Sequence, residues 1–261
     1  MAISDVIVAI GDWSAFAGRT IWGVLTGQTP LREIVPVCVA IGVQSAGVVL
    51  VTGAFIGMVL AVQTYSQFHA LGLESALGTV INVAVIKELG PVFTGIMLAG
   101  RIGSSMAAEL GTMRVTEQID ALSCLGVNPI HYLVGPRFLA CLFMIPLLSV
   151  LAIVTGIGGG AVICLNVFGI EPHHYWTKTQ QYIDLWDLSA GMIKPFFFGA
   201  MIGLVSCHRG FHCRAGAVGV GQAATEALVY SFLAILVLDF FLVLALNGIE
   251  TIMWPDASAG M

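Results

Sequence analysis

The sequence contains very little charge. Only 10% of its 261 residues are Asp, Glu, Lys or Arg, whereas 58% are hydrophobic. An ordinary soluble domain carries roughly a quarter charged residues. Too few polar groups are therefore present to cover the surface of a soluble globular enzyme. Because 15 acidic residues outnumber 10 basic ones and no basic patch is visible, a nucleic-acid partner is also excluded.

Two common sequence signatures are missing. The six cysteines are scattered, mostly within apolar runs, so they form no disulfide framework. No G-x-x-x-x-G-K-[ST] motif occurs, so the chain has no P-loop, and any ATP hydrolysis needs another chain. Two cysteine–histidine pairs, Cys207-His208 and His212-Cys213, offer zinc-type ligands. Their spacing fits no standard zinc finger, so we assign no metal ligand.

Long apolar runs are abundant. A transmembrane helix needs about 20 predominantly apolar residues. Five stretches with at most two charges each meet this requirement. We therefore predict an all-α membrane protein with transmembrane helices at 37–63, 75–100, 138–165, 188–207 and 227–248. The chain forms a single membrane domain over residues 1–261 in this interpretation.

Residues 1–30 differ from these five stretches. They lack the basic start of a signal peptide, and Asp5 and Asp12 interrupt the apolar residues. Asp5, Asp12 and Arg19 recur every seven residues and so share one helical face. We predict a helix that lies in the membrane interface, with a sixth, poor span as the alternative.

The distribution of basic residues predicts the orientation of the chain. With the N-terminus in the cytoplasm, one basic residue lies in the outer segments, Lys178, and seven lie in the cytoplasmic ones. Those seven are Arg19, Arg32, Arg101, Arg114, Arg137, Arg209 and Arg214. The short C-terminal tail is then periplasmic, because five spans place the two termini on opposite sides.

A few charges fall inside the predicted spans. Lys87 and Glu88 lie near the middle of the second span, and Pro91 follows them. A charge at that depth costs roughly 2.5–3.5 kcal/mol, so such residues usually face a cavity or a partner. Adjacent helical residues do not face each other, so these two are not expected to pair. The alternative is a structural pair with Lys194 or Asp239, although Lys194 lies near a span end and is expected to snorkel.

Residues 101–136 form the one long cytoplasmic segment. They combine apolar residues with charges at helical spacing, which predicts an amphipathic helix or helix pair beneath the membrane. Such a segment offers its charges to a soluble partner. The alternative is a solvated loop, but the high apolar content argues against it.

Several stretches resemble one known family, the MlaE permeases. The resemblance is carried by KELGPVFTGIMLAGRIGSSMAAELGTMRVTEQIDAL at Lys87–Leu122, and also by 53–63, 135–148 and 236–242. It covers residues 30–247. It implies a permease without enzymatic activity, which forms a homodimer and binds two cytoplasmic ABC ATPase subunits that carry the ATP and Mg. It further implies an MCE-domain hexamer on the outer side and, in some systems, a STAS-domain protein.

The resemblance also assigns roles to individual residues. The positions that match the lipid cavity are Leu60, Gln63, Lys87, Glu88, Leu89 and Lys194. The positions that match the coupling helix in the ATPase groove are Glu109, Arg114, Glu117, Gln118 and Asp120. Many relatives carry Arg where this chain has Lys87, and a lysine keeps the charge but loses bidentate phosphate contact.

The resemblance implies ATP-driven transport of phospholipid between the inner and outer membranes, with the permease in a bacterial inner membrane. Two alternatives stay open. One is a self-contained secondary transporter of a lipophilic substrate, with Glu88 and Asp239 as a proton relay. The other is a non-transporting membrane anchor for an ATPase. The direction of transport and the identity of the headgroup do not follow from the sequence.

Overall fold

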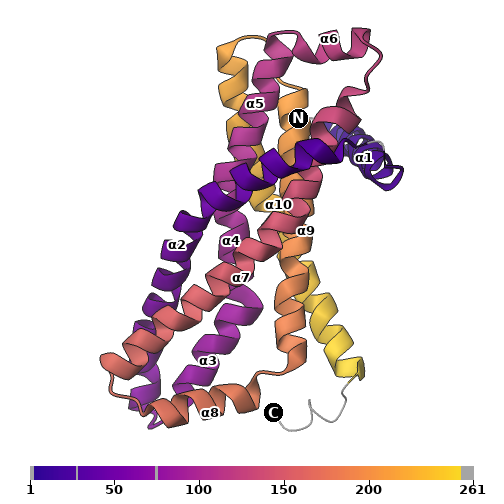
Figure 1. Ribbon diagram of the computed structural model, residues 1–261. Coiled ribbons are helices and arrows are strands. Elements are labelled where there is room, and N and C mark those ends of the chain that lie inside the picture. Colours follow the sequence, from indigo (N-terminus) through magenta and orange to yellow (C-terminus); the bar gives the residue numbers. More distant parts are fainter. Residues whose placement is uncertain (1–2, 28, 74–75, 254–261) are drawn as a thin grey trace. The chain divides into compact units, whose positions relative to one another are not determined.

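The computed structural model describes residues 3–27, 29–73 and 76–253, which are helical with short connections and contain no strand. Five helical stretches are long and apolar enough to cross a membrane: Ile34–Ala70, Leu77–Val115, Ile130–Asn166, Leu185–Phe211 and Ala217–Met253. A further helix, α1 (Ile3–Leu25), precedes them (Figure 1). The predicted class, an all-α membrane protein with five spans and an N-terminal helix, is confirmed. The predicted C-terminal tail beyond residue 253, residues 1–2 and 28 of the interfacial segment and the predicted span start at 75 lie outside the described residues.

Most of these stretches correspond to single helices. The first span is α2 (Ile34–Ala70), which a short 3-10 turn, η1 (Leu31–Glu33), precedes. The third consists of η5 (Ile130–Val134) and α7 (Gly135–Asn166), the fourth is α9 (Leu185–Phe211), and the fifth is α10 (Ala217–Met253). A short helix, α8 (Pro172–Tyr182), connects the third span to the fourth.

The second span is built from five consecutive helical pieces. These are α3 (Leu77–Ala84), η3 (Val85–Leu89), α4 (Gly90–Leu98), η4 (Ala99–Gly103) and α5 (Ser104–Val115). Both η3 and η4 are π-helical turns. Pro91 lacks the N–H that would bond to the carbonyl of Lys87, which loosens the ladder next to η3. Such π-turns often occur at functional sites, and this one carries Lys87 and Glu88.

By their internal contacts, the residues group into two compact units. Among the described residues, the first unit contains those within 3–44, 96–144 and 198–235, and the second contains those within 45–95, 145–197 and 236–253. In the first unit, Ala17 of α1 packs with Phe138 and Leu204. In the second, the core includes Leu77, Ile81 and Tyr175. Each unit thus has its own apolar core.

Glycines allow α2 and α7 to pack closely in the second unit. A Cβ at Gly53 would lie 2.7 Å from the carbonyl oxygen of Ala152. A Cβ at Gly57 would overlap the carbonyl oxygen of Gly156. Small residues at four-residue spacing permit such backbone approach in membrane helices. At these positions the four-residue glycine spacing therefore serves the packing of two helices of the same chain.

The helix α8 is attached to α3 by buried hydrogen bonds. The Tyr175 hydroxyl donates to Asn82 Oδ1 at 3.2 Å, and Asn82 Nδ2 donates to Thr179 Oγ1 at 3.1 Å. A Cβ at Gly78 would lie 2.6 Å from Cδ2 of the Tyr175 ring, so only glycine leaves room for that ring. In Figure 1, α8 lies beside the lower end of α3.

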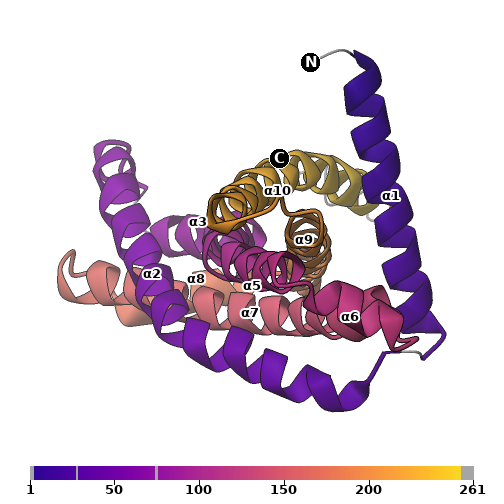
Figure 2. The same cartoon turned by 90° about the horizontal axis from the view of Figure 1, so that it is seen from above.

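Within the first unit, α1 runs across the direction of the last turns of α9. Figure 2 shows these turns of α9 nearly end-on, whereas α1 lies in the plane of the view. Phe16 and Ala17 of α1 are buried, while Ile7, Ile10 and Trp22 are exposed. A helix with this orientation and exposed apolar residues fits the predicted position in a membrane interface.

Candidate functional site

Charged side chains that are far apart in the sequence meet in the second unit. Lys194 Nζ of α9 lies 2.5 Å from Glu88 Oε2 of η3 and 3.2 Å from Asp239 Oδ1 of α10. Lys87 Nζ lies 2.6 Å from Asp187 Oδ1 and 3.7 Å from Glu250 Oε2. We call these six residues the charged cluster. It joins the second, fourth and fifth spans.

Lys194 is the buried centre of one half of the charged cluster. Its side chain is 2% exposed, whereas those of Glu88 and Asp239 are 43% and 19% exposed. The expectation that Lys194 snorkels to the surface is therefore wrong. Two carboxylates within ion-pair distance compensate the ammonium group, so the side chain can stay buried.

Lys87 and Glu88 take different partners, as expected for neighbours on a helix. Lys87 reaches Asp187 at the start of α9, and Glu88 reaches Lys194 further along the same helix. Asp187 is buried and also accepts a hydrogen bond from the backbone N–H of Asp184 at 3.2 Å. Glu88 thus forms the pair with Lys194 that the structural alternative predicted.

The charged cluster is packed with little space between its members. The hollow among the described residues of this region has a volume of about 10 Å³ and is lined in part by Lys87, Glu88, Lys194 and Glu250. Both lysines are engaged by carboxylates, and the carboxylates outnumber them. A ligand phosphate would therefore have to replace a carboxylate at one of the lysines.

An apolar pocket lies in the same unit. Its volume is about 380 Å³, and the described residues that line it are Phe55, Ile56, Val59, Leu60, Gln63, Leu89 and Phe93. Among these, Gln63 alone has a polar side chain. The structure thus brings Leu60, Gln63 and Leu89, three of the six predicted lipid-cavity residues, together in one pocket. Sequence reasoning missed Phe55, Ile56, Val59 and Phe93, although the i, i+4 spacing of Phe55, Val59 and Gln63 on α2 indicates a shared face.

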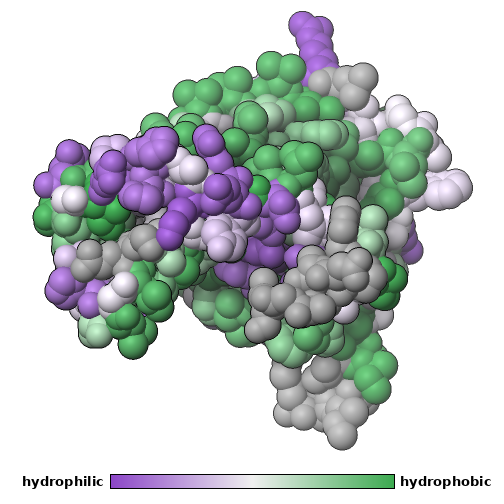
Figure 3. All heavy atoms as spheres, turned by 90° about the horizontal axis from the view of Figure 1, so that it is seen from below, coloured by the Kyte–Doolittle hydropathy of each residue, from purple (hydrophilic) through white to green (hydrophobic). Residues whose placement is uncertain are grey.

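The pocket and the charged cluster are joined through η3. Leu89 lines the pocket, and Glu88, the preceding residue, belongs to the cluster. On the face of the second unit where α8 lies, hydrophilic residues form a band between apolar surfaces (Figure 3). The arrangement offers apolar chains a place beside groups that bind charge.

The predicted coupling residues lie in the first unit on α5, α6 (Gln118–Cys124) and the turn between them. Glu109 pairs with Arg137 at 3.0 Å, and Arg114 pairs with Asp120 at 2.6 Å. Glu117 has a φ of 60°, in the left-handed region, and Gln118 begins α6. This backbone conformation, uncommon for a residue other than glycine, produces the sharp turn.

Part of the predicted coupling segment continues the second span. Helix α5 extends to Val115, whereas we expected this span to end at 100. The apolar residue Leu125, just after α6, is 78% exposed. A charged turn followed by an exposed apolar side chain is a suitable surface for a protein partner.

Comparisons with known proteins agree with this architecture. The model of the family described as permease MlaE matches residues 32–245. A probable ABC transporter permease protein of Synechocystis is 39% identical over 225 residues, which cover 86% of each chain. The chloroplastic protein TRIGALACTOSYLDIACYLGLYCEROL 1 of Arabidopsis thaliana is 38% identical over 226 residues, which cover 87% of this chain and 65% of the plant protein.

A further relative is the intermembrane phospholipid transport system permease protein MlaE of Haemophilus influenzae. It is 35% identical over 237 residues, which cover 89% of this chain and 91% of the relative. The resemblance seen at Lys87–Leu122 is therefore confirmed over most of the sequence. With its five membrane-spanning helices, this chain belongs to the MlaE permease family.

Proposed function

We propose that this chain is the permease subunit of an ATP-driven ABC transporter that moves phospholipid between the inner and outer membranes. The observation that carries the proposal is the apolar pocket beside the charged cluster, in a chain of the MlaE permease family. The name of the Haemophilus relative supports phospholipid as the cargo.

The pocket suits the acyl chains of a lipid. Its 380 Å³ lies within the usual range of ligand pockets, about 300–1,000 Å³. Burying each CH₂ group is worth about 0.8 kcal/mol, so a bare lipid leaves a bilayer slowly. A pocket lined by Leu60, Leu89 and Phe93 offers the chains a comparable apolar environment and lowers that barrier.

The charged cluster suits the headgroup. Lys87 and Glu88 are partly exposed, so a phosphate can replace a carboxylate at Lys87 while Glu88 receives a cationic group. After this exchange each lysine still has an anionic partner, the phosphate for Lys87 and Asp239 for Lys194. Such a site binds and releases its ligand through competition between ligand and carboxylates.

ATP hydrolysis is assigned to partner chains. Two cytoplasmic ABC ATPase subunits bind ATP and Mg and dock on the coupling residues around Glu117 and the exposed Leu125. Closure of the ATPases then moves α5 and collapses the lipid pocket, which changes the affinity for lipid between two states. An MCE-domain hexamer on the outer side receives the lipid, and a STAS-domain protein joins in some systems.

The chain acts as a homodimer in a bacterial inner membrane, with its N-terminus in the cytoplasm and its C-terminus in the periplasm. Helices α2 and α10 leave much apolar surface uncovered within one chain, including Val43, Phe55 and Phe240. Lipid and a second copy of the chain together cover this surface. The excess of arginine in the predicted cytoplasmic segments supports the orientation.

Native mass spectrometry tests this assembly. The tagged chain is purified from its own membranes in mild detergent. The proposal predicts two permease copies with two ATPase chains, an MCE hexamer and bound phospholipid. A single chain without ATPase or lipid, under conditions that preserve other membrane complexes, would contradict it and favour a secondary transporter that uses Glu88 and Asp239 as a proton relay.

A further inference from the structure

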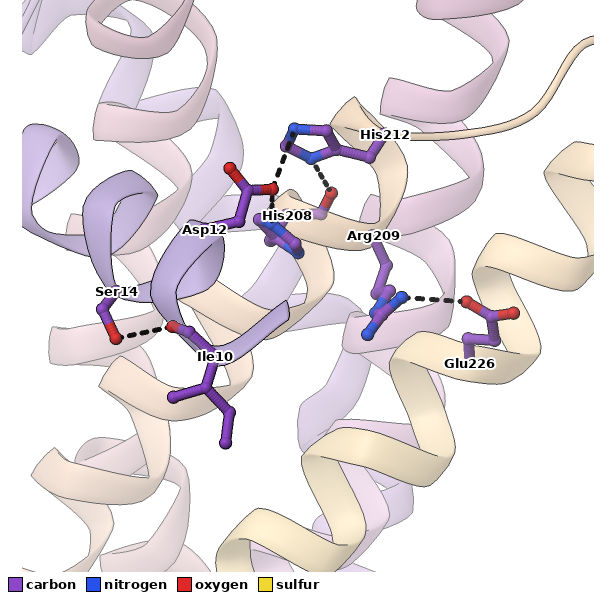
Figure 4. A network of polar contacts seen from close by, with 7 residues as sticks. All are labelled: Ile10, Asp12, Ser14, His208, Arg209, His212 and Glu226. Atoms are coloured by element: carbon purple, nitrogen blue, oxygen red, sulfur yellow. Dashed lines mark hydrogen bonds and ion pairs between the residues drawn. The ribbon is translucent and has the colours of Figure 1, made fainter. Parts of the chain in front are cut away.

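Three side chains with metal-binding groups meet in the first unit, and none of them lines the apolar pocket. Asp12 lies on α1, and His208 and His212 lie one turn apart at the end of α9 (Figure 4). Asp12 Oδ2 is 3.6 Å from His208 Nε2 and 3.8 Å from His212 Nε2. The three ligand atoms lie within 4.8 Å of one another.

The hydrogen bonding of His212 directs its second nitrogen at this point. Its Nδ1 lies 2.9 Å from the backbone carbonyl oxygen of His208. A carbonyl oxygen only accepts hydrogen bonds, so Nδ1 carries the proton and the neutral ring has a free lone pair on Nε2. A metal-ligating histidine almost always uses its other nitrogen in this way.

His208 supplies a second nitrogen, whose hydrogen-bonding capacity is unsatisfied. Its side chain is 8% exposed, and its Nε2 is buried without a hydrogen-bond partner among the described residues. The Asp12 carboxylate, at 3.6 Å, is beyond hydrogen-bond distance. Phe16 packs edge-on against the His208 ring at a centroid distance of 5.2 Å and holds it in place. Buried polar atoms of this kind usually have a partner, which indicates one that is absent here.

The separations fit an ion between the three groups. Zinc binds imidazole nitrogen and carboxylate oxygen at about 2.0–2.2 Å, so tetrahedral ligand atoms lie about 3.3–3.6 Å apart. The three ligand atoms, which lie 3.6 and 3.8 Å from each other across Asp12 and within 4.8 Å overall, reach this range when the exposed Asp12 and His212 side chains close around the buried His208 ring. We propose that Asp12, His208 and His212 form a binding site for Zn²⁺ or a similar divalent transition-metal ion.

The neighbouring Cys213 does not belong to this site. The Cys213 thiol donates to the carbonyl oxygen of Arg214 at 3.1 Å, and its sulfur would lie 3.3 Å from a Cβ at Gly111 of α5. Two imidazoles and one carboxylate are therefore the protein ligands. Because Asp12 and His212 are about half exposed, water can occupy a fourth position. Ligands of this type suit zinc better than magnesium or calcium.

A bound ion ties α1 to the last turns of α9. These two helices are far apart in the sequence and meet here through one carboxylate and two rings (Figure 4). Binding of an ion to the folded chain stabilises that contact by mass action. The metal ion thus links the N-terminal helix to α9, whatever ligand the apolar pocket binds.

Metal uptake by the full-length chain in detergent tests the proposal. The chain carries no polyhistidine tag, is stripped with a chelator and is then titrated with Zn²⁺ alone, and bound zinc is counted by elemental mass spectrometry. We expect one zinc ion per chain. Asp12→Asn and His212→Ala each weaken binding by at least about tenfold, the lower limit reported even for loss of an outer-shell partner.

Two matched variants serve as controls. His174→Ala removes an exposed histidine that faces a single carboxylate, Glu171, at 3.8 Å. Cys213→Ser removes the adjacent thiol. Both retain wild-type zinc binding under the proposal. Because Asp12 and His212 are exposed, their variants are expected to fold, which size-exclusion profiles and helix content verify.

Cobalt substitution gives an independent measurement. Co²⁺ bound to imidazole and carboxylate shows visible d–d bands without the thiolate charge-transfer band. Wild-type zinc binding in Asp12→Asn and His212→Ala, or a thiolate band that disappears in Cys213→Ser, would overturn the assignment. So would a wild-type chain that binds no zinc, since the cluster would then be a histidine–aspartate ion pair only.

Discussion

Lys194 Nζ and Glu88 Oε2 lie 2.5 Å apart although the residues are 106 positions apart in the sequence. The contact joins η3 to α9, and Asp239 extends it to α10. The second, fourth and fifth spans are thus connected, within the second unit, through one buried ammonium group.

Lys194→Met is expected to destabilise the chain. The substitution removes the cation between Glu88 and Asp239 and leaves two carboxylates close together. Loss of one partner from a buried pair costs about 3–5 kcal/mol, and the partial exposure of Glu88 places the expected cost near the lower limit. Thermal unfolding in detergent measures the change.

Two companion variants complete that test. Arg19→Met on α1 removes an exposed cation outside the charged cluster and is expected to change stability by no more than about 0.5 kcal/mol. The double variant Lys194→Met/Glu88→Gln is expected to regain part of the loss, because one of the two like charges is gone. If Lys194→Met were as stable as the wild type, the ion pair would not contribute to the stability of the fold.

Filling the apolar pocket is expected to prevent lipid binding. Leu60→Trp and Leu89→Trp each place an indole in a space of about 380 Å³. Phospholipid that copurifies with the chain should decrease several-fold, as counted by mass spectrometry of extracted lipids. Val167→Trp adds the same side chain just after α7, at a position that is 65% exposed and outside the pocket, and it should leave the bound lipid unchanged. Equal loss in all three variants would argue against the pocket.

The turn at Glu117 allows its backbone role to be separated from its carboxylate. Glu117→Gly keeps the left-handed conformation and relieves about 1 kcal/mol of strain, whereas Glu117→Val makes that conformation harder to adopt. If the carboxylate contacts the ATPase, both variants lower lipid-stimulated ATP hydrolysis, but only Glu117→Val lowers stability. Full hydrolysis activity in Glu117→Gly would remove Glu117 from the coupling contact.

Tyr175 gives the contact between α8 and α3 a predictable pH dependence. Burial raises the pKa of Tyr175 to about 12, although its hydrogen bond to Asn82 acts in the opposite direction. An unfolded tyrosine has a pKa of about 10. Because the folded chain holds this proton more tightly, the contribution to stability is full below pH 10 and is lost as the pH rises towards 12.

Stability measurements across that pH range check this prediction. Tyr175→Phe cannot ionise, so the decrease between pH 10 and 12 should be smaller than in the wild type. At neutral pH the variant should be less stable by about 1–3 kcal/mol, because Asn82 Oδ1 loses its donor. A decrease of equal size in both proteins would assign the pH dependence to other groups.

The spans were predictable because charge is so scarce that its absence marks each helix. Their ends were not, since helices such as α5 continue past the apolar window into polar sequence. The burial of Lys194 was missed because a lysine near a span end usually snorkels, and its two carboxylate partners come from distant helices.

The proposed metal site also combines residues from helices that are far apart in the sequence, so it was only partly predictable. The i, i+4 spacing of His208 and His212 is visible in the sequence, and it places both rings on one helical face. The third ligand, Asp12, lies on the first helix, and no sequence spacing connects it to α9. Cavity residues such as Leu60 and Leu89 came from the family resemblance, whereas Phe55 and Phe93 required the structure.

Phospholipid transfer by the reconstituted complex tests the central claim most directly. Proteoliposomes with the permease, its ATPase and its MCE partner are supplied with labelled phospholipid, and its transfer is followed with ATP, without ATP and under an imposed proton gradient. We predict transfer that requires ATP and the ATPase chain and that Leu60→Trp abolishes. Transfer that follows the proton gradient and continues without the ATPase would contradict the account.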